Sequence, residues 1–238
     1  MWPAPQVKSE GTGGMRASRG PLFMELTWLG HSCFRLRGKD ATVVTDPPAP
    51  STGYSLGRIS ADIVTVSHKH PGHSHVGGIG GEPKIVDGPG EYEIKQVLIS
   101  GVQTYHDNER GKRLGRNTAY LITLDDIHFC HLGDLGDTLD SRAQEALEGC
   151  DVLFVPVGGG AALNAEQACQ VIAQLSPRLI IPMHYATPAY KSDGTPLDGV
   201  DKFCKEMGVE PPEPVARLSI TTSSLPAETQ ITLMSYRG

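Results

Sequence analysis

The chain has 238 residues, a formal net charge of −6, and a composition of 39% hydrophobic and 20% charged residues. This balance can fill the core of one large α/β domain, and it argues against non-specific binding of nucleic acid or membrane surfaces, which needs a basic face. Five widely spaced cysteines without a C-x-x-C pair predict free thiols in a reducing compartment rather than a disulfide scaffold.

The N-terminal residues differ from the rest in composition. Residues 1–20 are rich in Pro, Gly and Ser and have no periodic apolar pattern, so we expect a flexible extension over residues 1–23 and a single domain over residues 24–238. The N-terminal residues lack the apolar stretch of a signal peptide, and no run in the sequence approaches the ~18 apolar residues of a membrane span. We therefore expect a cytoplasmic protein without membrane contact.

The first half of the domain is predicted to be rich in strands. Short alternating runs with the turn "RGKD" predict a β-meander over residues 24–48. Further strands are predicted at 61–67, 83–88, 96–105, 117–124 and 127–133.

Strands and helices alternate in the second half. Buried strands are predicted at 151–157 and 177–185. Between them Asn164 is predicted to cap a helix, with Gln167 at the capping-box position and an apolar stripe formed by Ala168, Val171, Ile172 and Leu175. A shorter helix is expected from an Asp198 cap to Gly208, followed by strands at 215–221 and 230–235. This order predicts two sheets that share one core, with helices outside.

The segment "VTVSHKHPGHSHVGG", residues 64–78, holds four of the nine histidines. His68 and His70 follow a predicted strand, and side chains two residues apart in extended backbone point the same way, so both rings can bind one cation. His73 follows the turn at "PG" and can face the same centre from another side. The pattern H-x-H-x-x-H therefore predicts a metal site.

Three further candidate ligands each follow an apolar strand. They are His106, Asp134 and His184. Ligands delivered by several strand ends to one edge of a sheet are typical of metal sites. The remaining histidines of the central region are expected to be ordinary loop or strand-face residues: His75, His128 and His131.

The ordered motifs "TDP", "SHKHPGH", "TYH", "HLGDLG" and "PMHY" resemble the five successive motifs of the metallo-β-lactamase superfamily. The resemblance runs from about Met24 to the C-terminus. It is closest to small bacterial metal-dependent hydrolases similar to ascorbate-6-phosphate lactonase, whose chains open with an "LGHS" like that at residues 29–32. It implies a four-layered αββα sandwich of the α/β class, with metals at one edge of the paired sheets.

The resemblance also implies a ligand set. One metal would be held by His68, His70 and His106. A second would be held by His73 and His184, and Asp134 would bridge the two ions.

Two residues near these ligands have implied supporting places. Asp46 matches an aspartate of the family that supports the ligand loop from behind. His31 is expected near the mouth of the site, or alternatively as a hydrogen-bonded structural histidine.

Gly72 departs from the family pattern. The second motif of the family reads H-x-H-x-D-H, and its aspartate ligates the second metal and orients the attacking water. With glycine there, Asp134 is the only anionic ligand, and the more positive site predicts a strong first metal beside a weak second one. Asp107 and Asp137 are possible substitutes, although Asp107 is expected to point away and Asp137 requires a tight turn.

The predicted reaction follows from such a metal. A metal-bound hydroxide would hydrolyse a small, anionic lactone, ester or phosphodiester. The catalytic residues are predicted to be Asp134, which holds the hydroxide, and His184, which hydrogen-bonds the substrate oxygen when the second metal is absent. Zinc is expected as the cofactor, in one or two copies, and manganese or iron also fits the ligands.

Two questions stay open at this point. The cations of the loop over residues 107–118 either steer the anionic substrate or are simply solvated: Arg110, Lys112, Arg113 and Arg116. The alternatives to a hydrolase are an iron-dependent redox protein and a non-catalytic metal-binding protein on the same fold. A phosphodiesterase acting on nucleic acid would need an inserted domain, for which this chain has no room.

Overall fold

The structure is a computed structural model that describes residues 24–192 and 194–236. The predicted N-terminal extension, residues 1–23, lies outside the described residues. No helix within the described ranges has the length and apolar character needed to cross a lipid bilayer. The five cysteines are all described and are free thiols, as predicted.

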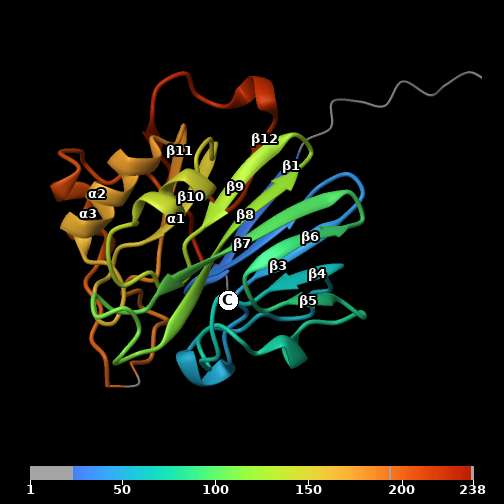
Figure 1. Ribbon diagram of the computed structural model, residues 1–238, viewed down its shortest axis with the longest axis horizontal. Helices are drawn as coiled ribbons and strands as arrows, with labels where there is room; N and C mark the ends of the chain where they lie inside the picture. Colours follow the sequence, from blue (N-terminus) through green and yellow to red (C-terminus); the bar gives the residue numbers. More distant parts are fainter. Residues whose placement is uncertain (1–23, 193, 237–238) are drawn as a thin grey trace, which may run out of the picture.

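The N-terminal part of the chain forms a six-stranded sheet (Figure 1). The predicted meander forms antiparallel hairpins, and β3, β4 and β5 then run parallel to one another. The C-terminal strand β12 pairs with β1 and completes the sheet. In the sheet order these strands are β12 (Leu218–Ile220), β1 (Met24–Gly30), β2 (Cys33–Arg37), β3 (Thr42–Thr45), β4 (Ile63–Thr65) and β5 (Lys84–Val86).

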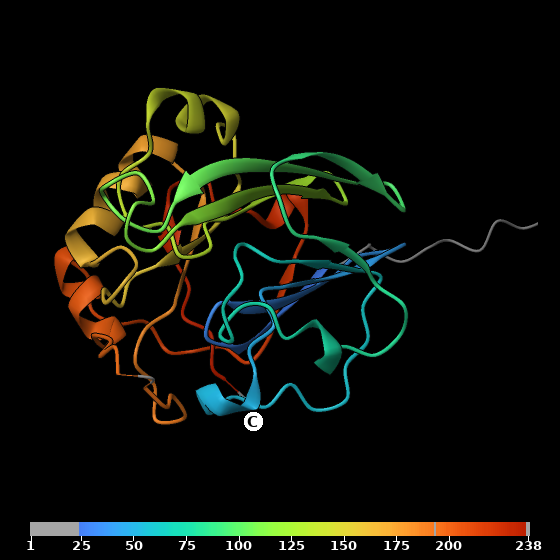
Figure 2. The same ribbon diagram turned by 60° about the horizontal axis from the view of Figure 1, so that its bottom comes forward.

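A second sheet of seven strands faces the first one (Figure 2). It begins as antiparallel hairpins and continues as parallel strands from β9 onward, because the later connections pass through helices. In order, its strands are β13 (Gln230–Ile231), β11 (Leu179–Met183), β10 (Val152–Pro156), β9 (Ile127–His131), β8 (Arg116–Leu124), β7 (Val97–Tyr105) and β6 (Gly90–Ile94).

Three α-helices accompany the seven-stranded sheet: α1 (Ser141–Ala146), α2 (Ala165–Leu175) and α3 (Val200–Glu206). The predicted capping box of α2 is confirmed, since Asn164 and Gln167 exchange hydrogen bonds, and the predicted apolar stripe is buried. Short 3₁₀ turns lie at η1 (Pro50–Thr52), η2 (Val76–Gly78) and η3 (Thr222–Ser224).

Two details of the helices differ from the sequence prediction. The N-cap of α3 is Gly199, not Asp198, and the Asp198 carboxylate instead lies 2.7 Å from Nζ of Lys202. Helix α1 was not predicted, because its six residues are too few to establish an apolar period. Its N-cap, Asp140, accepts a hydrogen bond from the backbone N–H of Ala143.

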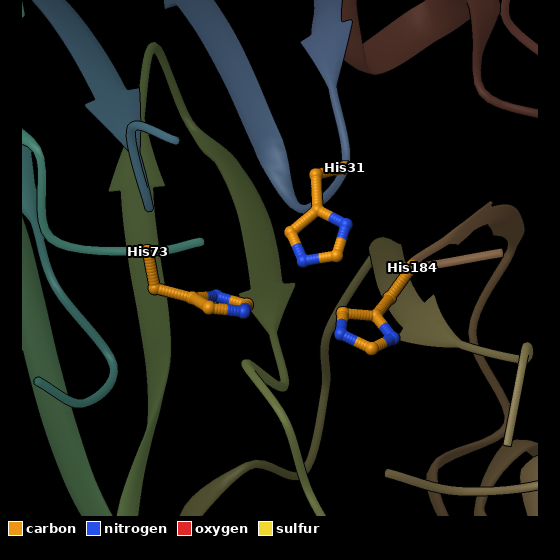
Figure 3. A group of neighbouring side chains, drawn as sticks. All are labelled: His31, His73 and His184. Atoms are coloured by element: carbon orange, nitrogen blue, oxygen red, sulfur yellow. The ribbon is translucent and has the colours of Figure 1, made fainter. Parts of the chain in front are cut away.

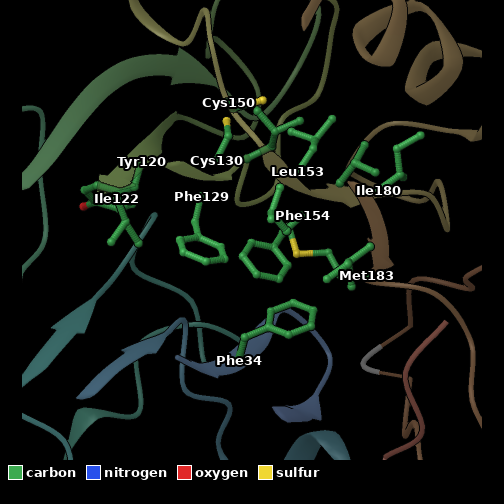
Figure 4. Packing of buried hydrophobic residues seen from close by; sticks show 14 of the residues in the cluster. Phe34, Tyr120, Ile122, Phe129, Cys130, Cys150, Leu153, Phe154, Ile180 and Met183 are labelled. Atoms are coloured by element: carbon green, nitrogen blue, oxygen red, sulfur yellow. The ribbon is translucent and has the colours of Figure 1, made fainter. Parts of the chain in front are cut away.

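The core lies between the two sheets (Figure 4). Phe34 from β2 packs on Phe154 from β10 with ring centroids 4.2 Å apart, and Phe129 from the neighbouring strand β9 stacks beside Phe154 with ring centroids 6.3 Å apart. All three side chains are fully buried. This shared core confirms the predicted pair of sheets, and it fixes the sheets relative to each other at the edge where the strands β4, β7, β9 and β11 end.

Removing the central ring should destabilise the whole sandwich. We expect Phe154→Ala to lower the free energy of unfolding by about 3–5 kcal/mol, because it removes a buried aromatic side chain and leaves a cavity. Chemical denaturation of the metal-free protein measures the effect. Leu98→Ala on β7, at a side chain that is 51% exposed, is the matched control and should cost far less. Equal costs for the two variants would contradict this account of the core.

Candidate metal centre

The Asp134 carboxylate is the centre of the site. It follows β9 and is buried, at 3% exposure. Four imidazoles surround its Oδ2 atom through their Nε2 atoms. The distances from Oδ2 are 3.0 Å to His73, 3.3 Å to His184, 3.4 Å to His106 and 3.8 Å to His68.

These separations match the spacing of atoms that share a metal ion. Two ligands bound tetrahedrally to zinc at 2.0–2.1 Å lie about 3.3 Å apart. Several polar atoms here are also buried without a hydrogen-bond partner in residues 24–192 and 194–236, namely Nε2 of His68, Nε2 of His73 and Oδ1 of Asp134. Such atoms are costly unless something satisfies them, and a divalent cation would do so. The residues present therefore fit a metal ion.

The possible ligands fall into three overlapping groups, in each of which one ligand atom per residue lies within 4.8 Å of the others. The groups are His68, His106 and Asp134; His68, His70 and His73; and His31, His73 and His184. All six residues predicted as ligands are thus brought together, and His31 joins them. Their coordination of a metal stays a prediction.

Asp46 supports the site from beneath. Its Oδ2 lies 2.8 Å from Nδ1 of His73, and its Oδ1 accepts a hydrogen bond of 2.7 Å from the backbone N–H of Ser67. A carboxylate on Nδ1 fixes the ring so that Nε2 faces the centre. His106 is held in the same way, because its Nδ1 lies 3.0 Å from the carbonyl oxygen of Ala161.

Asn117 is a positioning residue that is absent from the sequence predictions. It lies in β8, is 1% exposed, and its Oδ1 accepts a hydrogen bond of 3.0 Å from the backbone N–H of Asp134. Its Nδ2 donates to the carbonyl of Leu132 and to Oγ1 of Thr104. One amide therefore joins the ends of β7, β8 and β9. An asparagine in a strand has no local pattern that distinguishes it from a solvent-facing one.

Mutual attraction sets the charges of the metal-free site. Burial favours a neutral ring, but the carboxylates of Asp134 and Asp46 outweigh it and raise the pKa of His73 to about 10. Burial would likewise raise the pKa of Asp134, yet the imidazoles of His184 and His73 hold it well below its usual range. Burial, followed by repulsion from His184 and His73, holds the pKa of His31 well below its ordinary value.

His31 lies deeper than expected. It occupies the turn between β1 and β2, is 4% exposed, and stands beside His184 with ring centroids 4.2 Å apart (Figure 3). Its Nδ1 is buried and makes no hydrogen bond to any other described residue, and the side chain lines the cavity of the site. The backbone of His31 has φ 52°, as does that of His184.

The surroundings of Gly72 are full. A Cβ atom at this position would lie 3.0 Å from Nε2 of His31 and 3.1 Å from Nδ1 of His70. The described residues with positive φ do not include Gly72, so a left-handed backbone is not the reason for glycine here. Glycine is favoured here because the imidazoles of His31 and His70 approach the backbone closely.

Neither aspartate considered as a substitute for the missing carboxylate reaches the site. Asp107 is occupied by its own loop, where its carboxylate accepts hydrogen bonds from the backbone N–H groups of Glu109, Gly111, Arg113 and Leu114. Asp137 accepts from the backbone of Thr138. Within the described ranges, no group of potential metal ligands contains either residue.

The other three histidines lie apart from the metal groups formed by the described residues. His75 and His128 are exposed. His131 is buried in β9, where Nε2 lies 2.8 Å from the carbonyl of Ser32 and Nδ1 accepts from the N–H of Gly133. Its role is structural.

A cavity of about 490 Å³ opens above the candidate ligands. Two cations, Lys69 and Lys191, line it, together with the ring of Tyr190. From the loop over residues 107–118, the residue that lines it is Leu114. The four basic side chains of that loop are exposed and lie outside the lining of this cavity, which favours the interpretation that they are solvated.

Comparison with known proteins identifies the family. Residues 25–184 match the beta-lactamase superfamily domain. The chain is similar to a putative zinc-dependent hydrolase of the metallo-β-lactamase superfamily from Thermotoga maritima, with 34% identity, a TM-score of 0.73, and coverage of 90% of this chain and all of that one. The chain therefore belongs to the metallo-β-lactamase superfamily, and the predicted αββα sandwich is the fold of this family.

Two further similarities are informative. A metal-dependent hydrolase of Methanoculleus marisnigri is 29% identical over 196 residues, which are 71% of this chain and 85% of the relative. The diiron β-hydroxylase CmlA of Streptomyces venezuelae is 13% identical, with a TM-score of 0.59 over 85% of this chain and 54% of that one. The second likeness is one of fold alone.

Metal binding should release protons. Below a pKa of about 10 the metal-free His73 ring is charged, whereas a coordinated ring is neutral, so each ion bound there at pH 7 should displace at least one proton. The apparent zinc affinity should accordingly fall about tenfold per pH unit from pH 8 to pH 6 for each proton displaced. Calorimetry in buffers of different ionisation enthalpy measures this. A binding enthalpy independent of the buffer would contradict the charge assignment.

Proposed function

We propose that this metal-dependent hydrolase of the metallo-β-lactamase superfamily cleaves a small anionic lactone, ester or phosphodiester. The observation that carries the proposal is a buried carboxylate, Asp134, set among four imidazoles at the floor of a cavity with two lysines in its wall. The narrower likeness to ascorbate-6-phosphate lactonase is part of this proposal.

The proposed first metal is held by His68, His70 and His106, with Asp134 as its anionic ligand. Zinc is the proposed ion, because a donor set of imidazoles and one carboxylate suits it, and manganese or iron is compatible with the same donors. A divalent ion in such a site polarises the substrate oxygen and makes water more acidic, so hydrolysis proceeds near neutral pH.

Asp134 and His184 are the proposed catalytic residues. Oδ1 of Asp134 is buried and without a hydrogen-bond partner among the described residues, so it can accept a hydrogen bond from the attacking water and orient it. The low pKa of Asp134 means that this carboxylate positions the water rather than keeping its proton. His184 can donate a hydrogen bond from Nε2 to the substrate oxygen when one ion is bound, and it is free to act as a ligand when two are bound.

The cavity supports an anionic substrate of modest size. Its volume of about 490 Å³ falls in the range of sites for small organic molecules. Lys69 lies between the ligand candidates His68 and His70, and Lys191 approaches from the segment after β11. Two cations at the rim of a net acidic protein attract a carboxylate or phosphate group and hold it beside the metal.

Removing the metal should abolish the reaction. We expect slow hydrolysis of anionic lactones and activated phosphodiesters, its loss on chelation, and its return when zinc or manganese is restored. His68→Ala/His70→Ala should hold no ion at the first site and show no turnover, whereas His75→Ala, an exposed neighbour, should retain both properties. A metal-loaded protein that turns over no member of such a panel would favour the alternatives, and elemental analysis that finds iron alone would favour the redox one.

The two lysines should select for charge. We expect Lys69→Ala/Lys191→Ala to raise KM for an anionic ester about tenfold or more, and to leave KM for its neutral analogue within about twofold, because only the charged group loses its partners. Lys112→Ala/Arg113→Ala, which removes two cations outside the cavity lining, is the matched control. An equal change for both substrates would contradict the proposed role of the lysines.

A further inference from the structure

We propose that His31 is a protein ligand of the second metal ion, and that its imidazole takes the place of the aspartate that the family carries at the position of Gly72. The proposed second site consists of His31, His73 and His184, with Asp134 shared between the two ions. This inference rests on the proposed function, since it completes the same metal centre.

The first support is the space around Gly72. A Cβ atom at this position would lie 3.0 Å from Nε2 of His31, which is closer than side chains normally approach. Any side chain here would begin against the rings of His31 and His70, so an aspartate would require at least one of them to shift. Glycine at 72 and the present position of His31 therefore depend on each other, and one imidazole fills the volume that a carboxylate would need.

The second support is the convergence of three rings. One nitrogen each from His31, His73 and His184 lies within 4.8 Å of the other two. The ring centroid of His31 is 4.2 Å from that of His184 and 5.0 Å from that of His73. Figure 3 shows the three rings gathered around one space, each from a different part of the chain. Imidazoles that meet this closely beside a shared carboxylate, here that of Asp134, are typical of metal ligands.

The third support is the way the chain holds His31. Its backbone adopts φ 52°, a conformation that costs energy for a residue with a side chain. Two hydrogen bonds to its carbonyl oxygen hold the backbone in this conformation. The carbonyl oxygen of His31 accepts a hydrogen bond of 3.0 Å from Nε1 of Trp28 and one of 3.3 Å from the backbone N–H of His184. The second bond ties one proposed ligand directly to another.

The exchange of donors changes the chemistry of the second site. An aspartate would supply one negative charge, whereas His31 supplies none, so the loaded centre is one unit more positive than the family pattern. Asp46 offsets part of this charge through His73, which it contacts at Nδ1. The remaining positive charge suits an anionic substrate, in agreement with the lysines of the cavity wall.

The experiment is a double-mutant cycle on metal binding. The variants are His31→Ala, Gly72→Asp and His31→Ala/Gly72→Asp, with His75→Ala as a control in the same segment as Gly72. Each metal-free protein is titrated with Zn²⁺ in competition with a chromophoric chelator, and with Co²⁺, whose visible absorption reports the ligands of each ion. Neither readout requires activity.

We expect two ions in the wild-type protein and in His75→Ala. His31→Ala should keep the first ion and bind the second at least about 100-fold more weakly, because it loses a direct ligand. The double variant should regain the second ion, since removal of the ring makes room for the carboxylate. Gly72→Asp alone should bind the second ion no more tightly than the wild type, because His31 obstructs the new side chain.

Two results would overturn the inference. The first is a second ion bound by His31→Ala with unchanged affinity and absorption. The second is a wild-type protein that binds a single ion whose affinity is unaffected by His31→Ala. Two bound ions without hydrolysis of any substrate would instead count against the proposed function alone.

A second measurement covers the case in which His31→Ala does not fold. A crystal structure of the zinc-loaded wild-type protein, with anomalous diffraction at the zinc edge, locates each ion directly. An ion at about 2.0–2.1 Å from Nε2 of His31 supports the inference. An ion beyond coordination distance of this atom overturns it.

Discussion

The site is organised around one buried carboxylate, that of Asp134. A lone carboxylate in such a place would carry a large desolvation penalty, and the surrounding imidazoles remove it. The arrangement works in both directions, because the same carboxylate offsets the repulsion between imidazoles held this close. Asn117 then fixes the backbone of Asp134 to the ends of β7, β8 and β9, so that the charge stands at a defined point of the sandwich edge.

The sequence predicted those parts of the site that are local in the chain. The spacing of His68 and His70 placed two rings on one side of an extended segment, and the apolar runs before His106 and His184 indicated strand ends that would meet at one edge. The fold followed from the change between hairpins and strand–helix alternation, a signal spread over the whole domain. The sequence does not predict short elements such as α1, because six residues are too few to show an apolar period.

The remaining parts depend on contacts between distant residues. The carbonyl of Ala161 reaches Nδ1 of His106 across 55 positions, and nothing near either residue signals the pairing. His31 is expected at the mouth of the site, whereas it is 4% exposed, and nothing near it in the sequence signals the rings of His73 and His184 that lie beside it. Gly72 is a further example. The sequence shows that the family's ligating carboxylate is missing at this position, but it does not show that the ring of His31 lies against the glycine.

The origin of the ligands has a mechanical consequence. His31 and His73 extend from turns of the six-stranded sheet, while Asp134 and His184 extend from strands of the seven-stranded sheet. An ion shared by these residues would be a cross-link between the two layers. The free energy of metal binding would then oppose any motion that separates the two sheets. The rigidity of the sandwich would therefore depend on the same metal occupancy as the proposed activity.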